Sequence, residues 1–196
     1  MPAVSDPVEQ DLVQRSQQGD LQAFDGLVLK YQGPIFNFAY RLLNHYDEAQ
    51  EVAQDTFIRA FRGIKTFRGE AMFSTWLYTI AANLARNRIR QNQRSRRVIA
   101  GSMDDPVSAE EGTLRYDAPD PHPSAAGVIE AEERERLVWE AVGRLEEPYR
   151  TVVVLRDLQG LTYEQIAAIC QCELGTVKSR LARSRERLKQ LLQGVL

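Results

Sequence analysis

Apolar residues recur every three or four positions along most of the first 93 residues, which is the spacing of one face of an α-helix. Asp20 stands where a helix cap is expected, and the helix after it carries Leu21, Phe24, Leu27, Val28 and Tyr31. Gly33 and Pro34 are expected to break that helix, because proline has no amide donor and clashes with the preceding turn. A second helix then carries Ile35, Phe38, Ala39, Leu42 and Leu43.

Two further helices are predicted before residue 95. Asp47 is placed to cap the first of them, and Gln50, three residues later, completes a pair like a capping box. The sequence GIKTFRG forms a short loop after this helix. Ser74 is expected to cap a long helix that ends near Gln93 and carries Leu77, Ile80, Ala81 and Leu84 on its apolar face.

Periodicity fails from about residue 95 to residue 127, where Ser, Pro, Gly, Ala and acidic residues dominate. Such a segment buries too little apolar surface to offset the entropy lost on ordering, so residues 96–128 are predicted to form a flexible acidic linker. Helical spacing then returns, and Pro148 is expected to begin a helix of sequence YRTVVVLRDL. Its valine run alone would favour a strand, but the neighbouring segments offer no strand to pair with it.

The last third of the chain carries the pattern of a helix-turn-helix. A short helix from Thr162 to Cys170 is followed by a tight turn and a longer helix that ends at Leu192. Thr162 and Gln165 form a capping-box pair at the start. The fold class is therefore predicted to be all-α, with two small helical domains over residues 11–95 and 129–194, the second containing the helix-turn-helix.

Charge is distributed unevenly, although the net charge of the chain is only −2. Residues 57–97 contain 10 Lys or Arg against 1 Asp or Glu, whereas residues 9–56 contain 3 against 8. Residues 161–196 are again basic, with 6 against 3. A local basic face is what attraction to nucleic-acid phosphates requires, and the alternative is a solvated helix surface that happens to be basic.

Candidate chemistry for catalysis is sparse. Cys170 and Cys172 lie two residues apart and far from His45 and His122, so the four ligands of a zinc site are missing and no metal is expected. The sequence shows no nucleophile–base pair and no phosphate-binding loop, so we expect no enzyme, no cofactor and no small-molecule substrate. An acidic N-terminus and the lack of a long apolar stretch predict a cytoplasmic protein without membrane insertion.

Three segments in order carry a resemblance to a known family: YRLLNHYDEAQEVAQDTFIRAF, FRGEAMFSTWLYTIAANLARNRIR and LTYEQIAAICQCELGTVKSRLARSRERL. They resemble the extracytoplasmic-function (ECF) sigma factors, group 4 of the sigma-70 family, over residues 11–192. The resemblance implies a factor that binds core RNA polymerase and directs promoter-specific initiation by reading the minus-35 and minus-10 elements and aiding strand opening. Glu173-Leu174 stands where the family often has Pro-Val, which leaves the approach of the following helix to DNA open.

The resemblance assigns two surfaces to the first domain. The helix over residues 47–61 docks on the β′ clamp of the polymerase, with Glu51, Gln54, Asp55 and Phe57 as the implied contacts; the alternative is a solvated acidic face. The loop and basic helix after it read the minus-10 element, with implied contacts at Lys65, Phe67, Arg68, Trp76, Asn83 and Asn87. Aromatic rings can hold unstacked bases and Asn amides can pair with base edges. Trp76 fits a partly buried structural position equally well.

The second domain is implied to read the minus-35 element through Arg156, Tyr163, Thr176, Lys178, Ser179, Arg180 and Arg183. Tyr163 could equally serve only to begin its helix. Implied partners are core RNA polymerase, through its β′ clamp and β flap, promoter DNA and an anti-sigma factor. The acidic linker either threads a basic channel of the polymerase or acts only as a tether.

A second class of function is a DNA-binding regulator whose N-terminal domain senses a ligand. Such a protein would form a symmetric dimer on palindromic half-sites and would hold a pocket within residues 20–95. The excess of basic residues in 57–97 argues against this class, because a ligand-sensing domain does not need a polyanion-binding face.

Overall fold

The computed structural model describes residues 6–100 and 125–193, and this part of the chain is built from helices without strands, as predicted. The 24 residues between these ranges, which hold most of the predicted linker, lie outside the described residues. The elements are α1 (Pro7–Gln17), α2 (Leu21–Leu43), α3 (Tyr46–Gly63), the 3₁₀ turn η1 (Ile64–Thr66), α4 (Phe73–Ala100), α5 (Ala125–Gly143), α6 (Glu147–Val153), the π-helical turn η2 (Val154–Leu158), α7 (Tyr163–Cys170) and α8 (Leu174–Leu192).

Helix α1 is absent from the sequence-based prediction, which places the first helix after Asp20. Its sequence has few apolar residues, and its buried side chains include only one that is hydrophobic: Glu9, Val13 and Ser16. Asp6 caps the helix by accepting a hydrogen bond from the amide of Val8 at 3.1 Å. Polar burial of this kind leaves no apolar periodicity for a sequence pattern to detect.

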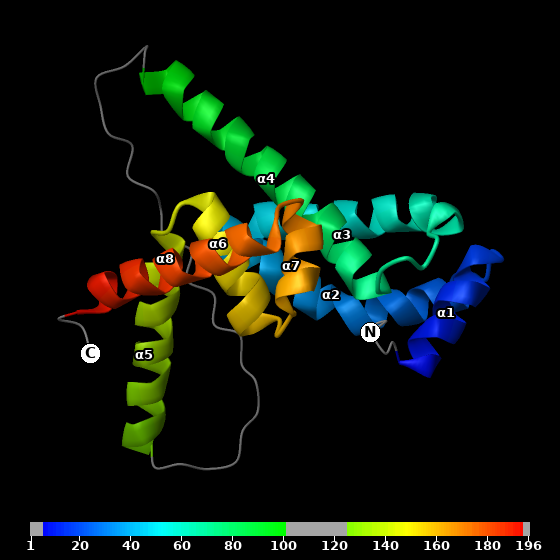
Figure 1. Cartoon of the computed structure of the whole chain (residues 1–196), viewed down its shortest axis with the longest axis horizontal. Coiled ribbons are helices and arrows are strands. Elements are labelled where there is room, and N and C mark those ends of the chain that lie inside the picture. Colours follow the sequence, from blue (N-terminus) through cyan, green and yellow to red (C-terminus); the bar gives the residue numbers. More distant parts are fainter. Residues whose placement is uncertain (1–5, 101–124, 194–196) are drawn as a thin grey trace.

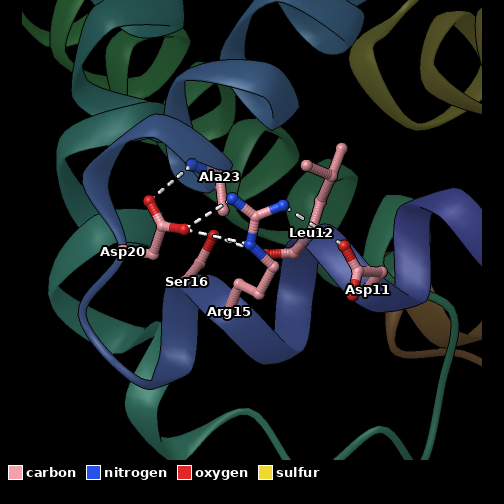
Figure 2. Close-up of polar contacts among 6 residues, drawn as sticks. All are labelled: Asp11, Leu12, Arg15, Ser16, Asp20 and Ala23. Atoms are coloured by element: carbon pink, nitrogen blue, oxygen red, sulfur yellow. Dashed lines mark hydrogen bonds and ion pairs between the residues drawn. The ribbon is translucent and has the colours of Figure 1, made fainter.

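The turn from α1 to α2 is fixed by a cluster of charged side chains (Figure 2). Arg15 donates to Asp20 through Nε at 3.0 Å and through Nη2 at 2.7 Å. The same carboxylate of Asp20 caps α2 by accepting from the amide of Ala23 at 3.1 Å, as predicted. Gly19 makes the turn possible, since its φ of +97° lies in the region that favours glycine.

Helix α2 runs without interruption through Pro34, so the predicted break at Gly33-Pro34 is wrong. The proline ring is exposed, and water can therefore satisfy the carbonyl oxygen that loses its partner. Buried residues on both sides of the proline, including Leu27 and Phe38, pack into one core and hold the two parts of the helix in line.

The predicted starts of α3 and α4 are each close to the observed ones but assign the wrong cap. His45, not Asp47, caps α3, and its Nδ1 accepts from the amide of Glu48 at 3.4 Å. Helix α4 begins at Phe73, one residue before Ser74, and continues to Ala100, beyond the predicted end near Gln93. The C-terminal end of α4 extends away from the other helices (Figure 1).

The helix-turn-helix is present as predicted. Thr162 and Gln165 form a reciprocal capping box at the start of α7, and Gln171 ends that helix in the left-handed region with a φ of 52°. The valine run is helical, because Val152 and Val153 lie in α6 and Val154 begins the π-helical turn. All three valines are buried, so their side chains are used for packing between helices and not for pairing strands.

The two halves of the structure share one hydrophobic core. Helix α7 lies alongside α4, and α2 contacts α5, α6 and the π-helical turn (Figure 1). The buried cluster includes Phe38 and Leu77 from the first half and Leu155, Ile166 and Leu181 from the second. Ala81 and Ala85 on α4 are fully buried, and their small side chains allow helices to approach α4 closely.

Polar contacts cross the same junction. The hydroxyl of Tyr78 donates to the side-chain oxygen of Gln159, and Nε of Arg86 lies 3.3 Å from the carboxylate of Glu147. Farther along the junction the guanidinium of Arg41 stacks over the ring of Trp139 at 3.9 Å from the ring centre.

Arg150 on α6 makes the most extensive set of these polar contacts. Its guanidinium donates to the carbonyl oxygens of Leu42 at 2.5 Å, Gly143 at 2.5 Å and Leu145 at 2.8 Å. These oxygens lie at the C-terminal ends of α2 and α5, where carbonyls lack helical partners and a positive charge is favourable. Burial lowers the pKa of Arg150 from its ordinary value, and the guanidinium remains charged at neutral pH.

Replacing this guanidinium should destabilise the protein measurably. We expect Arg150→Ala to lower the free energy of unfolding by about 2–3 kcal/mol, because carbonyl oxygens at two helix ends lose their donor. Arg144→Ala is the matched control, since Arg144 is exposed, and it should change stability by less than about 0.5 kcal/mol. Urea unfolding followed by circular dichroism measures both variants, and equal effects would contradict the assigned role of Arg150.

Candidate nucleic-acid interface

Helix α4 separates its apolar and basic side chains onto different faces. Leu77, Tyr78, Ala81, Ala82, Leu84 and Ala85 are buried, so the side of the helix that faces the core is apolar. Asn87 and Arg90 are exposed. Asn83 is half-buried, and its side-chain oxygen accepts from Nη1 of Arg86 at 3.1 Å. The helix thus presents amide and guanidinium groups along one strip.

Some of the basic charge of α4 is paired with the acidic face of α3. Arg88 donates to Glu51 at 2.5 Å, and the side-chain amide of Asn92 donates to both carboxylate oxygens of Glu48 at 2.9 Å. Such partly exposed pairs contribute little to stability and can exchange partners. Three of the predicted polymerase contacts are exposed on α3: Glu51, Gln54 and Asp55. Glu51 already has an intramolecular partner in Arg88.

Phe57, the fourth predicted polymerase contact, is half-buried and packs against the core. Two other apolar side chains of the same helix are more exposed: Ile58 at 40% and Phe61 at 47%. Phe61 also meets Phe24 of α2 edge-to-face, with ring centres 5.0 Å apart. The exposed surface of α3 thus combines acidic groups with apolar ones, and the sequence analysis identified only the former together with Phe57.

Three aromatic rings meet where the loop joins α4. The rings of Phe67 and Trp76 lie 5.0 Å apart, and Phe73 lies 5.9 Å from Phe67 and 5.7 Å from Trp76. Phe73 is buried, whereas Phe67 and Trp76 are half-buried. A Cβ at Gly63 would come within 3.3 Å of the indole, so the absence of a side chain there lets Trp76 fit.

A surface hollow of about 270 Å³ opens beside these rings. Its lining comes from the loop, the start of α4 and one residue of α7: Thr66, Phe67, Arg68, Gly69, Glu70, Ala71, Thr75, Trp76, Thr79 and Ala168. The loop residue Arg68 is exposed, as is Lys65 just before the hollow. An aromatic wall with a basic rim suits a base and its phosphate better than it suits a purely apolar ligand.

The structure therefore brings together three of the predicted minus-10 contacts, Phe67, Arg68 and Trp76, around the hollow, and Lys65 is exposed in the turn before it. Asn83 and Asn87 lie farther along α4, about 10 and 16 Å from Trp76 by the rise of a helix. The sequence analysis missed Thr75 and Thr79, which line the hollow. Thr79 lies three residues after Trp76 and four after Thr75, and this helical spacing is the signal that points to both threonines.

The predicted minus-35 contacts fall into two groups. Lys178, Ser179 and Arg183 are exposed on α8, and the hydroxyl of Ser179 donates to the carbonyl of Thr176 at 3.0 Å. Arg156 lies in the π-helical turn and donates to the carbonyl of Leu161 at 2.8 Å. Its guanidinium also lies over the ring of Tyr163, 5.1 Å from the ring centre.

Arg180 is placed differently from the other residues of its group. It is half-buried and lines a second hollow, of about 250 Å³, between α4 and the helix-turn-helix. Arg86, Arg90, Glu147 and Cys170 line the same hollow. Burial raises the pKa of the Cys170 thiol to about 11, so it stays protonated near neutral pH. Neither cysteine forms a disulfide.

No group of three His, Cys, Asp or Glu side chains capable of holding a metal is found in the described ranges 6–100 and 125–193. Within these ranges, none of the helices is both long and apolar enough to cross a membrane.

Two known protein families match this chain, one in each half. The family model for sigma-70 region 2 matches residues 27–95, and that for sigma-70 region 4 matches residues 135–188. These ranges fall inside the two predicted domains.

Full-length relatives match nearly the whole chain. It is 41% identical to the RNA polymerase sigma-H factor of Pseudomonas aeruginosa, with 96% of this chain and 95% of the relative covered. It is 37% identical to the ECF RNA polymerase sigma-E factor of Haemophilus influenzae, with 96% and 97% covered.

Among solved structures, the sigma factor RpoE in complex with the anti-sigma factor NepR from Bartonella quintana matches with a TM-score of 0.65 and 27% identity, and the match covers 87% of this chain and 96% of that one. The all-helical architecture, the order of the two family models and the relatives matched over nearly their whole length support the same assignment. The chain belongs to the ECF sigma factors of the sigma-70 family.

Proposed function

We propose that residues 11–95 bind core RNA polymerase and open the minus-10 element, and that residues 129–194 read the minus-35 element. One observation carries this division: an aromatic hollow with a basic rim and a helix-turn-helix with exposed basic residues occur in one chain, on separate halves. The factor supplies promoter recognition and performs no catalysis itself. It acts in the cytoplasm, where bacterial DNA and its polymerase are found.

Polymerase docking is assigned to the exposed face of α3. Glu51, Gln54 and Asp55 provide the polar contacts to the β′ clamp, and Phe57 supports them from a half-buried position. Ile58 and Phe61 add apolar area to the same surface, which favours a stable protein interface over a merely solvated helix. The second domain contacts the β flap.

Strand opening is assigned to the aromatic hollow and the strip along α4. An unstacked base can lie against Phe67 and Trp76 while Lys65 and Arg68 attract the phosphates next to it. Asn83 and Asn87 are spaced to meet bases farther along the same strand. Stacking supplies free energy without nucleotide hydrolysis, which is what a non-catalytic factor needs to melt DNA.

Reading both elements at once requires the two halves to separate. The elements are roughly 25 base pairs apart, which is about 85 Å of duplex, whereas in the packed arrangement α7 of the second half lies directly against α4 of the first. In the packed arrangement Arg180 also faces α4 across the second hollow. Separation of the halves exposes Arg180 beside Lys178, Ser179 and Arg183 for DNA, with Arg156, Tyr163 and Thr176 placed for the backbone.

An anti-sigma factor is the third proposed partner. The relative from Bartonella quintana was solved in complex with one, and the present chain matches 96% of that structure. Exposed apolar side chains such as Leu21, Leu29 and Phe61 offer area for such a protein. A ligand-sensing regulator is less well supported, because the hollow lined by residues 66–79 opens at the surface beside the exposed cation of Arg68 and does not enclose a ligand.

Run-off transcription tests the proposed function directly. Purified protein is added to core RNA polymerase with genomic fragments, and transcripts are mapped at their 5′ ends. We expect specific start sites that depend on the added chain. Absence of both core binding and defined start sites would sink the proposal.

Removal of Arg180 should weaken minus-35 reading. We expect Arg180→Ala to reduce discrimination between intact and mutated minus-35 elements by about 1–3 kcal/mol, since guanidinium groups pair with guanine edges, while core binding is unchanged. Lys189→Ala is the control, because Lys189 is an exposed cation near the far end of the same helix. Competition binding with holoenzyme measures both, and unchanged discrimination would remove Arg180 from the reading set.

Weakening the junction should favour DNA binding by the free factor. Tyr78→Phe keeps the ring and removes the hydrogen bond to Gln159, which shifts the balance toward the separated form by about fivefold. We expect a minus-35 duplex to bind the variant more tightly by up to that factor. Tyr46→Phe, at an exposed ring of α3, is the control. Equal affinities for variant and unaltered protein would show that separation does not limit binding.

A further inference from the structure

The side chain of Gln17 reaches from α1 to the loop that precedes α4. Its Nε2 donates to the carbonyl oxygen of Phe67 at 2.7 Å and to that of Ile64 at 3.2 Å. One amide group therefore holds both ends of the segment that contains Lys65. Gln17 is half-buried and lies outside the residues matched by the region 2 family model.

Helix α1 is anchored firmly enough to serve as a support for this contact. Two residues before Gln17, Arg15 is bound to Asp20 in the turn to α2 (Figure 2). At the other end of the helix, Glu9 is 4% exposed, accepts from the hydroxyl of Tyr31 and lies 2.8 Å from Nζ of Lys30. Both ends of α1 are thus bonded to α2 or to its cap, so the backbone of Gln17 is held in place.

The loop segment itself has few other polar restraints. The amide of Phe67 donates to the carbonyl of Ile64 at 3.1 Å, and the hydroxyl of Thr66 donates to the carbonyl of Gly63 at 2.8 Å. Both bonds are local to the turn, so they shape it without fixing it to the rest of the domain. Gln17 adds a long-range polar attachment to the packing of Ile64 and Phe67.

We propose that Gln17 is a positioning residue for the minus-10 reading loop, which it holds so that the ring of Phe67 and the cations at Lys65 and Arg68 face single-stranded DNA in a fixed geometry. This inference rests on the proposed function of the loop. Gln17 acts through the backbone of Phe67 and does not itself touch DNA. A loop held before DNA arrives loses less conformational freedom on binding.

A residue with this role affects selectivity at one promoter element and not DNA binding in general. Releasing the loop lets Phe67 and its neighbours take several orientations, so correct and incorrect minus-10 bases are distinguished less well. Two hydrogen bonds to carbonyls of a half-buried turn correspond to a loss of about five- to tenfold in selective binding. Minus-35 reading, on the other half of the chain, is unaffected.

The test compares paired substitutions on one helix. Gln17→Glu keeps the shape but points carboxylate oxygens at two carbonyls, and Gln17→Met removes the donor without adding charge. Gln14→Glu and Gln14→Met are the controls, because Gln14 is an exposed amide on the same helix. The probes are a single-stranded minus-10 oligonucleotide, its base-substituted versions and a minus-35 duplex, each measured with holoenzyme formed on core polymerase.

We expect both Gln17 variants to lose about five- to tenfold in preference for the correct minus-10 strand, with unchanged affinity for the minus-35 duplex and for core polymerase. Amide hydrogen exchange of residues 64–69 in the free variants should accelerate. The Gln14 variants should match the unaltered protein in every measurement.

Two results would overturn the inference. The first is an unchanged exchange rate in residues 64–69, which shows that Gln17 does not hold the loop. The second is an equal loss of affinity for both DNA probes, which indicates a general loss of folding. If the unaltered holoenzyme itself prefers no minus-10 sequence, the proposed function fails, and the exchange rates alone then decide whether Gln17 restrains the loop.

Discussion

Helix α4 is a structural member of both halves of the molecule, and the rest of the arrangement depends on this double burial. Leu77 and Ala81 belong to the core formed with α2 and α3, while Tyr78 bonds to Gln159 across the junction. A helix buried from two directions has a narrow remaining surface, and that surface carries the basic and amide groups. The strip therefore runs along the edge of the junction, where Arg86 pairs with Glu147 while Asn87 and Arg90 are exposed.

The same constraint explains why opposite charges meet between α3 and α4. The two helices pack side by side, so acidic groups at the edge of α3 lie within reach of cations on α4, as Glu51 and Arg88 do. Because these pairs are partly exposed, their contribution is small and exchange with an external partner costs little. The pairing also reduces repulsion among the cations of α4.

Sequence patterns predicted the elements whose signals are local. The capping box of Thr162 and Gln165 and the alternation of helix and turn after it are properties of adjacent residues, and they were confirmed. Pro34 was misread because tolerance of proline depends on the ring facing solvent, and solvent exposure is a property of the whole domain. Helix α1 was missed because it buries Glu9, whose partners Tyr31 and Lys30 come from α2, and Ser16, whose hydroxyl donates to the carbonyl of Leu12 in α1 itself. Contacts across the junction, such as Arg150 with Leu42, join residues more than a hundred positions apart and leave no mark in local sequence.

The bonding of Arg150 has a mechanical consequence. Two of its three acceptors, Gly143 and Leu145, lie in the same half of the chain as Arg150, and only Leu42 lies in the other. In the proposed separation of the halves, the guanidinium keeps its bonds to Gly143 and Leu145, and the carbonyl of Leu42 is left for water to satisfy. The guanidinium of Arg150 therefore stays oriented by its own half of the chain. When the halves pack together again, only the hydrogen bond to Leu42 has to reform, so little conformational entropy is lost at this contact.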